Sequence, residues 1–151
     1  MTDYPEQGSA SVHVDAPPEV VWALIADVTR MGEWSPECVK AEWVDGATGP
    51  AVDAPFRGYN QAGTFEWDLP CVVTACAPGR VFEFDAPSEG SVRTRWRFEV
   101  APDGAGTQLT ESFDAPMINV DGAAANFDGR YEMLVEAIGR TIANIKAAAE
   151  A

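Results

Sequence analysis

The sequence has few of the residues that bind metals or form disulfides: one histidine, His13, and three cysteines among 151 residues. Three cysteines cannot all pair within one chain, and free thiols are typical of a reducing compartment. Cys71 and Cys76 lie on one predicted strand, where a spacing of five residues places them on opposite faces and too far apart to pair. No Cys or His cluster has the spacing of metal ligands, so we expect no metal site and no cofactor.

Basic residues are also few, because 10 Lys and Arg stand against 24 Asp and Glu, which gives a formal net charge of −14. This charge repels both the phosphates of nucleic acids and anionic membrane surfaces. The sequence lacks an apolar run near the roughly 20 residues that span a bilayer, and its first ten residues do not resemble a signal peptide. We therefore expect a cytoplasmic monomer or homodimer that neither binds nucleic acid nor inserts into a membrane.

The hydrophobic content of 46% is enough for one compact domain over residues 1–151, with residues 1–8 flexible. Apolar and polar residues alternate over residues 9–16 and predict a first strand with His13 on its outer face. Helical spacing then predicts a helix from about residue 17 to 29. Gly and Pro interrupt residues 31–38, which predicts a short second helix or turn.

Residues 39–116 have a period of two, which predicts antiparallel strands joined by hairpins, with turn signals at residues 46–50, 77–79, 86–90 and 101–106. One face of each strand is apolar and the other charged, as in a sheet that covers a single layer. Arg93, Arg95 and Arg97 face outward beside Glu83 and Asp85, so we expect a cross-strand charge ladder. The inward rows predicted here are Val39, Ala41, Trp43; Phe56, Gly58, Asn60; Phe65, Trp67, Leu69, Cys71, Val73; Phe82, Phe84; Thr94, Trp96, Phe98, Val100; and Leu109, Glu111, Phe113.

The last of these rows contains an acid, because Glu111 shares its face with Leu109 and Phe113. A buried carboxyl is tolerated where its row faces a partly hydrated cavity instead of packed side chains. The structural alternative is a hydrogen bond from Asn60, a threonine or a bound water, with no part in chemistry.

The chain ends with apolar residues spaced by three or four over residues 121–150, which predicts a long amphipathic helix capped by Asp121 and lying across the inner face of the sheet. The loop before it carries three apolar side chains, Met117, Ile118 and Val120, between Pro116 and Gly122. We interpret this loop either as a gate over a pocket mouth or as a segment fastened to the sheet edge by these side chains.

The order of these elements, together with the segment VHVDAPPEVVWALIADVTRMGEWSP, resembles the START-related helix-grip superfamily, also called SRPBCC. The segments APPEVVW, GYNQAG, TRWRFEV and LTESF resemble its polyketide cyclase/dehydrase-like branch. The resemblance covers nearly the whole chain and implies an α+β fold. In it, a curved antiparallel seven-stranded sheet wraps around the C-terminal helix, two short helices follow the first strand, and a hydrophobic cavity lies inside. The superfamily includes lipid carriers, hormone receptors, aromatic cyclases and partner-binding proteins, so the fold does not decide the function.

Our leading hypothesis is the binding or carriage of a small hydrophobic ligand, aromatic, polyketide-like or lipid-like, in this cavity. For each aromatic residue, simple core packing is the alternative. Trp34 is expected to plug the edge of the fold near the pocket mouth. The candidate ligand-binding residues are Asn60, Phe65, Trp67, Phe82, Phe84, Thr94, Trp96, Glu111, Phe113, Met117, Phe127 and Tyr131.

A rival hypothesis is a polyketide cyclase or dehydratase in which Glu111 moves a proton, its pKa raised by burial. The sequence offers this enzyme no second catalytic group, since His13 faces outward and no inward Arg or Lys is evident. A third hypothesis is a partner-binding module, which would need an exposed apolar patch.

Overall fold

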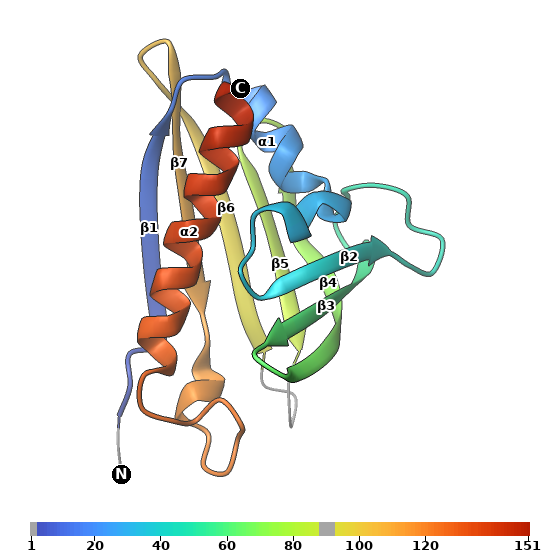
Figure 1. Ribbon diagram of the computed structural model, residues 1–151. Helices are drawn as coiled ribbons and strands as arrows, with labels where there is room; N and C mark the ends of the chain where they lie inside the picture. The colour runs from blue at the N-terminus through green and yellow to red at the C-terminus, as the bar shows by residue number, and fades with distance from the viewer. Residues whose placement is uncertain (1–2, 88–92) are drawn as a thin grey trace.

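A computed structural model describes residues 3–87 and 93–151 of the chain. Seven strands form one antiparallel sheet in the order β1-β7-β6-β5-β4-β3-β2, and its curved inner face holds a long C-terminal helix (Figure 1). This is the α+β helix-grip fold expected from the sequence. The strands are β1 (Gln7–Val14), β2 (Cys38–Trp43), β3 (Pro55–Ala62), β4 (Phe65–Ala77), β5 (Val81–Pro87), β6 (Arg93–Asp103) and β7 (Gly106–Asp114). The helices are α1 (Pro18–Ala26), η1 (Val28–Glu33), η3 (Pro116–Asn119) and α2 (Arg130–Glu150), where η marks a 3₁₀ helix.

The N-terminal segment is more ordered than the flexible residues 1–8 that we expected. Gln7 and Gly8 already belong to β1 and pair with the end of β7. Before them, the Tyr4 backbone N–H donates to the Asn119 side-chain oxygen over 2.9 Å. Residues 1 and 2 lie outside the described part. Backbone pairing thus reaches two residues further towards the N-terminus than the apolar alternation indicated.

Two short helices follow β1, as predicted, but the first ends earlier than residue 29. Asp27 has an extended backbone (φ −86°, ψ 90°) and closes α1 after Ala26. Its side chain accepts a hydrogen bond from the Thr29 backbone N–H over 3.1 Å and so caps η1. The apolar spacing of the sequence continues through this junction, which is why spacing alone did not indicate the break.

Two β-bulges overturn predicted side-chain directions, because each bulge inserts one residue and reverses the alternation beyond it. In β2 the register shifts between Cys38 and Lys40, so Val39 is 52% exposed and Cys38 is buried in its place. Gly32 packs against this bulge: a Cβ on Gly32 would lie 2.2 Å from the carbonyl oxygen of Val39.

The second bulge lies in β4, between Val73 and Ala75. It places Cys76 opposite Phe82, whose side chain is fully buried in the core. Cys76 therefore packs against the core on the same face as Cys71, not on the opposite face. Both thiols are free in the structure.

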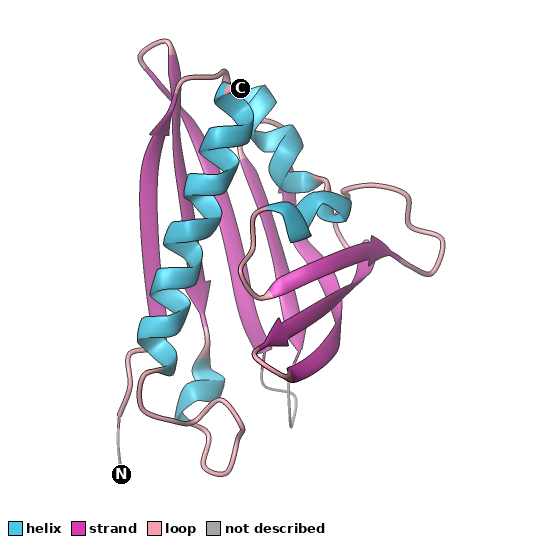
Figure 2. Cartoon of the chain, in the orientation of Figure 1, coloured by secondary structure: helices cyan, strands magenta, loops and turns pink. Residues whose placement is uncertain are grey.

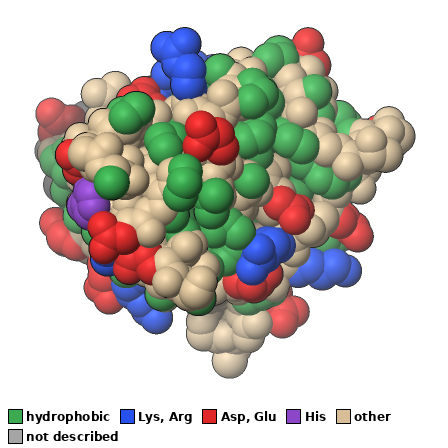
Figure 3. All heavy atoms as spheres, turned by 90° about the horizontal axis from the view of Figure 1, so that it is seen from above, with side chains coloured by type: hydrophobic (Ala, Val, Ile, Leu, Met, Phe, Trp, Pro, Cys, Tyr) green, Lys and Arg blue, Asp and Glu red, His purple; other side chains and the backbone are tan. Residues whose placement is uncertain are grey.

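The outer face of the sheet carries the predicted charge ladder. Arg95 Nε donates to Asp85 Oδ1 over 2.8 Å, and Arg97 Nη1 donates to Glu83 Oε2 over 2.9 Å, in both cases between β6 and β5. The predicted turn at residues 86–90 next to this ladder lies mostly outside the described residues. Figure 3 views the molecule from one end, where acidic side chains are scattered among apolar ones.

The long helix begins at Arg130, nine residues later than predicted. Gly129 adopts the left-handed conformation (φ 93°) directly before it, and residues 121–129 form turns, so Asp121 is not its cap. From there α2 crosses the concave face of the sheet (Figure 2). Its buried side chains are Leu134, Ile138, Thr141, Ile142 and Ile145. Among the described residues, no helix is long and apolar enough to span a membrane.

Candidate functional site

A cavity of about 160 Å³ lies between the concave face of the sheet, α2 and the segment that joins η1 to β2. The sheet forms its floor with inward side chains of β3 to β7, and α2 forms its roof with Ala137, Ile138 and Thr141. Most of the lining is apolar. Such a space between an amphipathic helix and a curved sheet arises because the small residues Gly58, Ala86 and Ala137 leave room that larger side chains would fill.

Seven of the twelve residues predicted to bind a ligand line this cavity, and they come from β3, β4, β5, β6, β7 and η3. Alternation along each strand brings them to one face, so this part of the site was readable from the sequence. They are Asn60, Trp67, Phe84, Thr94, Trp96, Glu111 and Met117.

The other five predicted residues do not line the cavity. Phe82 is fully buried in the core, and Phe113 belongs to a second core cluster against which Tyr131 packs, with ring centroids 6.0 Å apart. Phe65 shares the face of Trp67, but it lies beyond the covered part of the sheet and is 62% exposed. Phe127 is 41% exposed because α2 begins after it.

Apart from Met117 of η3, sequence reasoning missed the residues that come to the cavity from outside the sheet. Trp34, expected to be only a plug, is 4% exposed and lines the cavity. The Asn144 side-chain amide donates a hydrogen bond to the Trp34 backbone carbonyl oxygen over 3.0 Å. Glu37 and Arg130 also lie on the wall, so the cavity does contain an inward arginine. Gly129 followed by helical spacing was a signal for a helix that starts at Arg130, whereas no local pattern marks Trp34 or Glu37.

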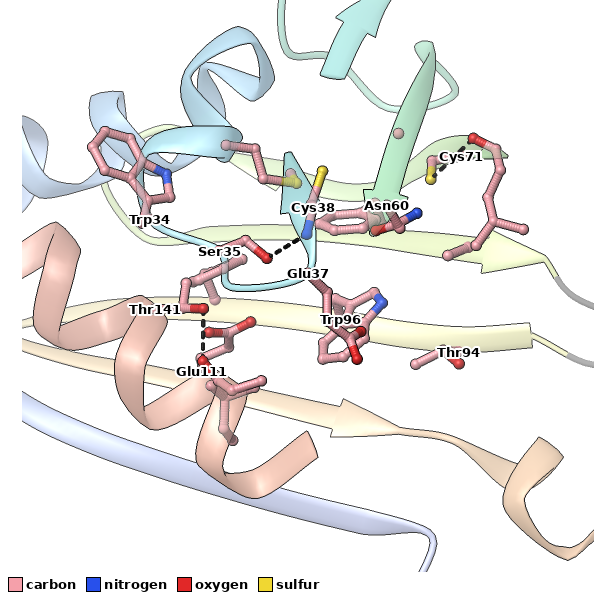
Figure 4. A pocket seen from close by; sticks show the side chains of 18 of the residues that line it. Trp34, Ser35, Glu37, Cys38, Asn60, Cys71, Thr94, Trp96, Glu111 and Thr141 are labelled. Atoms are coloured by element: carbon pink, nitrogen blue, oxygen red, sulfur yellow. Dashed lines mark hydrogen bonds between the residues drawn. The ribbon is translucent and has the colours of Figure 1, made fainter. Parts of the chain in front are cut away.

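Glu111 is the acid that the alternation of β7 directs inward, and its side chain is 4% exposed. Figure 4 shows its carboxyl group pointing into the cavity beside Thr141. Among the residues that the structure describes, none forms a hydrogen bond with its Oε1 atom. The structural alternative of a bond to this atom from Asn60 or a threonine is therefore not formed, and a bond from a bound water stays a prediction. Burial raises the pKa of Glu111 well above its ordinary value, which favours the neutral carboxyl group.

An ion pair at the cavity wall joins two segments that are distant in the sequence. Arg130 donates from Nη1 to Glu37 Oε1 over 2.5 Å and from Nη2 to Glu37 Oε2 over 3.3 Å. The side chains are only 16% and 20% exposed. This bidentate ion pair links the first residue of α2 to the residue before β2. It thereby connects the helix to the edge of the sheet that β2 forms.

Two thiols flank Gly58 on the floor of the cavity: a Cβ atom on Gly58 would lie 3.8 Å from Cys38 Sγ and 3.9 Å from Cys71 Sγ. Burial raises the pKa of the Cys71 thiol to about 12 and also raises that of Cys38. Both groups are thus neutral, poorly nucleophilic thiols that behave as small apolar side chains. The described residues contain no cluster of three or more His, Cys, Asp or Glu that could hold a metal ion.

The loop before α2 has a divided role. Met117 lines the cavity and accepts a hydrogen bond from the Thr94 hydroxyl over 3.0 Å. Ile118 is 1% exposed and packs in a core cluster with Leu134, which fastens η3 to the helix. Val120 is 38% exposed. The side chain of Ile118 thus has the fastening role, and movement of the loop over the cavity stays a prediction.

The geometry described so far is that of an apolar cavity between a long helix and a curved sheet, and comparison with known proteins agrees with this fold. A family model described as polyketide cyclase / dehydrase and lipid transport matches residues 6–150. The chain belongs to this family. No curated protein matches the chain by sequence.

Among solved structures, this family member is similar to the Polyketide_cyc-like protein Cgl2372 of Corynebacterium glutamicum. The two are 28% identical over 99% of this chain and 91% of the other, with a TM-score of 0.62. It also resembles the di-domain ARO/CYC protein StfQ from the steffimycin biosynthetic pathway, at 14% identity over 96% of this chain and 50% of that one, with a TM-score of 0.74. Ara h 8.0201 is 10% identical over 95% and 96% of the two chains, with a TM-score of 0.71. The last two comparisons support the fold alone.

Proposed function

We propose that the protein binds and carries a small hydrophobic molecule in the cavity under α2, as a cytoplasmic binding protein of one domain. The observation that supports this most is the cavity of about 160 Å³ with its mostly apolar wall. An apolar space of this size is costly to leave empty, and comparable cavities of about 150 Å³ admit benzene. The aromatic side chains Trp67, Phe84 and Trp96 offer flat surfaces against which a ring packs.

The size of the cavity limits the ligand. At the packing density of protein interiors, about 0.75, a space of 160 Å³ holds roughly 120 Å³ of atoms. This corresponds to one ring or two small fused rings. A larger polyketide or a long acyl chain would need the cavity to widen, for which the contact between Glu37 and Arg130 would have to open.

Gly58 offers a direct test, because its Cβ position faces the cavity and its backbone does not have a positive φ. In Gly58→Ala the methyl group would meet the two thiols at ordinary contact distances of 3.8 and 3.9 Å, so this variant is the control. In Gly58→Leu the longer side chain would occupy the cavity. Naphthalene and an environment-sensitive apolar dye should raise the melting temperature of the wild type and of Gly58→Ala. In Gly58→Leu these shifts should be smaller, and the affinity for both probes should be at least about tenfold lower. If no apolar probe binds the wild type, the proposed function is wrong.

A second candidate is an acid or base enzyme of the cyclase or dehydratase type. It is favoured by the carboxyl group of Glu111, whose pKa burial raises and whose Oε1 atom has no partner among the described residues. A proton-transfer group typically contributes about 100-fold to 10,000-fold in rate. Mass spectrometry of a compound that co-purifies with the protein would identify the molecule to test. Conversion of that compound by the wild type, with loss of rate but not of affinity in Glu111→Gln, would favour the enzyme over the carrier.

The loop that contains η3 is the part of the wall that we propose to move when a ligand enters. Amide hydrogen exchange at residues 115–122 should slow in the presence of a saturating apolar probe. Unchanged exchange would show that this loop does not move when a ligand binds, and the entry route would then be beside Glu37 and Arg130.

A further inference from the structure

The polar groups of the cavity differ in whether they already have partners. The Thr141 hydroxyl donates to the Ala137 carbonyl oxygen over 2.8 Å, and the Thr94 hydroxyl donates to the Met117 sulfur over 3.0 Å. The guanidinium group of Arg130 is engaged by Glu37. The protons of the two hydroxyl groups are thus already donated within the protein, and a ligand acceptor would have to displace an existing bond to use them.

Glu111 is different because its Oε1 atom is buried and, among the described residues, has no hydrogen-bond partner. A buried polar atom without a partner costs about 1–3 kcal/mol, so such atoms are rare and call for an explanation. In the structure the neighbouring Thr141 hydroxyl is directed to the Ala137 carbonyl oxygen and not to Glu111. Among the described residues, none on α2 donates to Oε1 of Glu111.

Asn60, the other free polar side chain in the cavity, does not face the same constraint. Its side chain forms no hydrogen bond with a described residue, but it is only partly buried, so water can solvate it. Figure 4 shows Asn60 and Glu111 extending from opposite walls of the cavity. A molecule in the cavity thus meets an unsatisfied acceptor at the β7 wall, aromatic surfaces in the middle, and a solvated polar group at the other side.

We propose that the ligand is a one- or two-ring aromatic compound that carries a neutral hydrogen-bond donor, an N–H or a phenolic O–H, which it donates to the carboxyl group of Glu111. This inference rests on the proposed binding function and adds the chemical class of the ligand. A carboxyl group retains an accepting oxygen whether it is neutral or ionised, so a donor satisfies it in both states. The size limit of the cavity and its aromatic floor supply the ring requirement.

Indole and benzofuran test the donor directly, because they have nearly the same shape and differ in an N–H against a ring oxygen. The wild type should bind indole at least about fivefold more tightly than benzofuran, as one buried hydrogen bond typically gives. Glu111→Met retains the side-chain volume but removes the acceptor, so its ratio of affinities should fall to about one. Glu111→Gln retains an accepting oxygen and should keep part of the preference, and Glu66→Gln, on an exposed position of β4, is the matched control.

The outcomes separate this inference from the proposed function. Binding of both probes with equal affinity by the wild type would overturn the donor requirement and leave the carrier standing. Binding of neither would overturn the carrier. A preference for indole that persists in Glu111→Met would assign the contact to another group and would also overturn the inference. If Glu111→Met does not fold, the carboxyl band of Glu111 in infrared difference spectra of the wild type decides: it should shift with indole and not with benzofuran, and no shift with indole refutes the contact.

Discussion

Two buried acids on opposite faces of the same sheet show what a partner does to a carboxyl group. Glu83 on the outer face is 9% exposed, and Glu111 on the inner face is 4% exposed. Glu83 accepts hydrogen bonds from Thr74 and Arg97 over 2.7 and 2.9 Å. Burial alone would raise its pKa, but these bonds outweigh burial and lower it. Glu111 is buried as well, but its Oε1 atom accepts no hydrogen bond from any residue that the structure describes, and its pKa is raised.

The carboxyl group of Glu83 is therefore satisfied by hydrogen bonds within the protein, whereas Oε1 of Glu111 has no partner among the described residues. Hydrogen bonds between β5 and β6 hold Glu83 to Arg97 and Asp85 to Arg95. Arg93 is held less closely, because its Nη1 atom has no hydrogen-bond partner among the described residues and lies 3.5 Å from Asp114 Oδ2. The carboxyl group of Glu111 instead retains binding capacity inside a space that a ligand can fill.

Removing the partnered acid should destabilise the fold most. Glu83→Gln loses the charge that accepts from Arg97 and Thr74, and we expect the free energy of unfolding to fall by about 1–3 kcal/mol. Urea unfolding at neutral pH measures this change. Glu99→Gln, at the exposed end of the same ladder, is the control and should change the free energy by less than about 0.5 kcal/mol. Equal effects of the two substitutions would contradict the contrast.

Removing the unpartnered acid should have the opposite sign. Glu111→Met replaces a desolvated carboxyl group with an apolar side chain of similar volume, so the free energy of unfolding should rise by about 1–2 kcal/mol at pH 8. The same urea experiment applies. A clear loss of stability would mean that Glu111 has a partner in solution that supports the fold.

The two acids should also give opposite pH dependences. The folded pKa of Glu111 is raised, so the folded state binds its proton more tightly, and this stabilisation is lost as the pH rises from about 4.3 through the folded pKa. The folded pKa of Glu83 is lowered, so its contribution is present above about 4.3 and is lost as the pH falls through the folded value.

Unfolding free energies of the wild type and Glu111→Gln, measured from pH 4 to 8, test the first statement. The wild type should lose stability relative to the variant as the pH rises, by at most about 1.4 kcal/mol per pH unit. Parallel curves would show that Glu111 has an ordinary pKa. Glu83→Gln should diverge from the wild type in the opposite direction between pH 3 and 5.

The smallest effect concerns the ion pair at the cavity wall. Glu37→Gln weakens the contact with Arg130, and we expect naphthalene to associate and dissociate about fivefold faster, as the loss of a partly buried pair worth about 1 kcal/mol predicts. Its equilibrium affinity should change little. Stopped-flow fluorescence measures both rates. Glu33→Gln is the control, because it removes an exposed ion pair with Arg30 that is not part of the cavity wall. If the rates are unchanged in both Glu37→Gln and this control, the contact between Glu37 and Arg130 is not a barrier to ligand entry.

Much of the sheet was predictable because alternation is a local property of a strand. The inward direction of Glu111, Trp96 and Asn60 and the outward ladder of arginines follow from counting residues. The same counting failed at Val39 and Cys76, where a bulge adds one residue to a strand. A bulge depends on how a strand pairs with its neighbour, as with Gly32 against the backbone of Val39, and the strand's own pattern does not show it.

The candidate site divides in the same way. From the sequence alone, the row of inward aromatic residues and the one inward acid were predictable, since both follow from a period of two along the strands. The helix-grip class of fold followed from the resemblance to a known superfamily. Only the tertiary structure decided that Trp34, Glu37 and Arg130 close the wall, that Phe65 and Phe127 remain outside, and that no described residue bonds to Oε1 of Glu111. The physical reason is that a cavity is bounded by side chains that are distant along the chain. Whether a polar atom inside it is satisfied depends on which of those side chains come within hydrogen-bond distance, which no local pattern records.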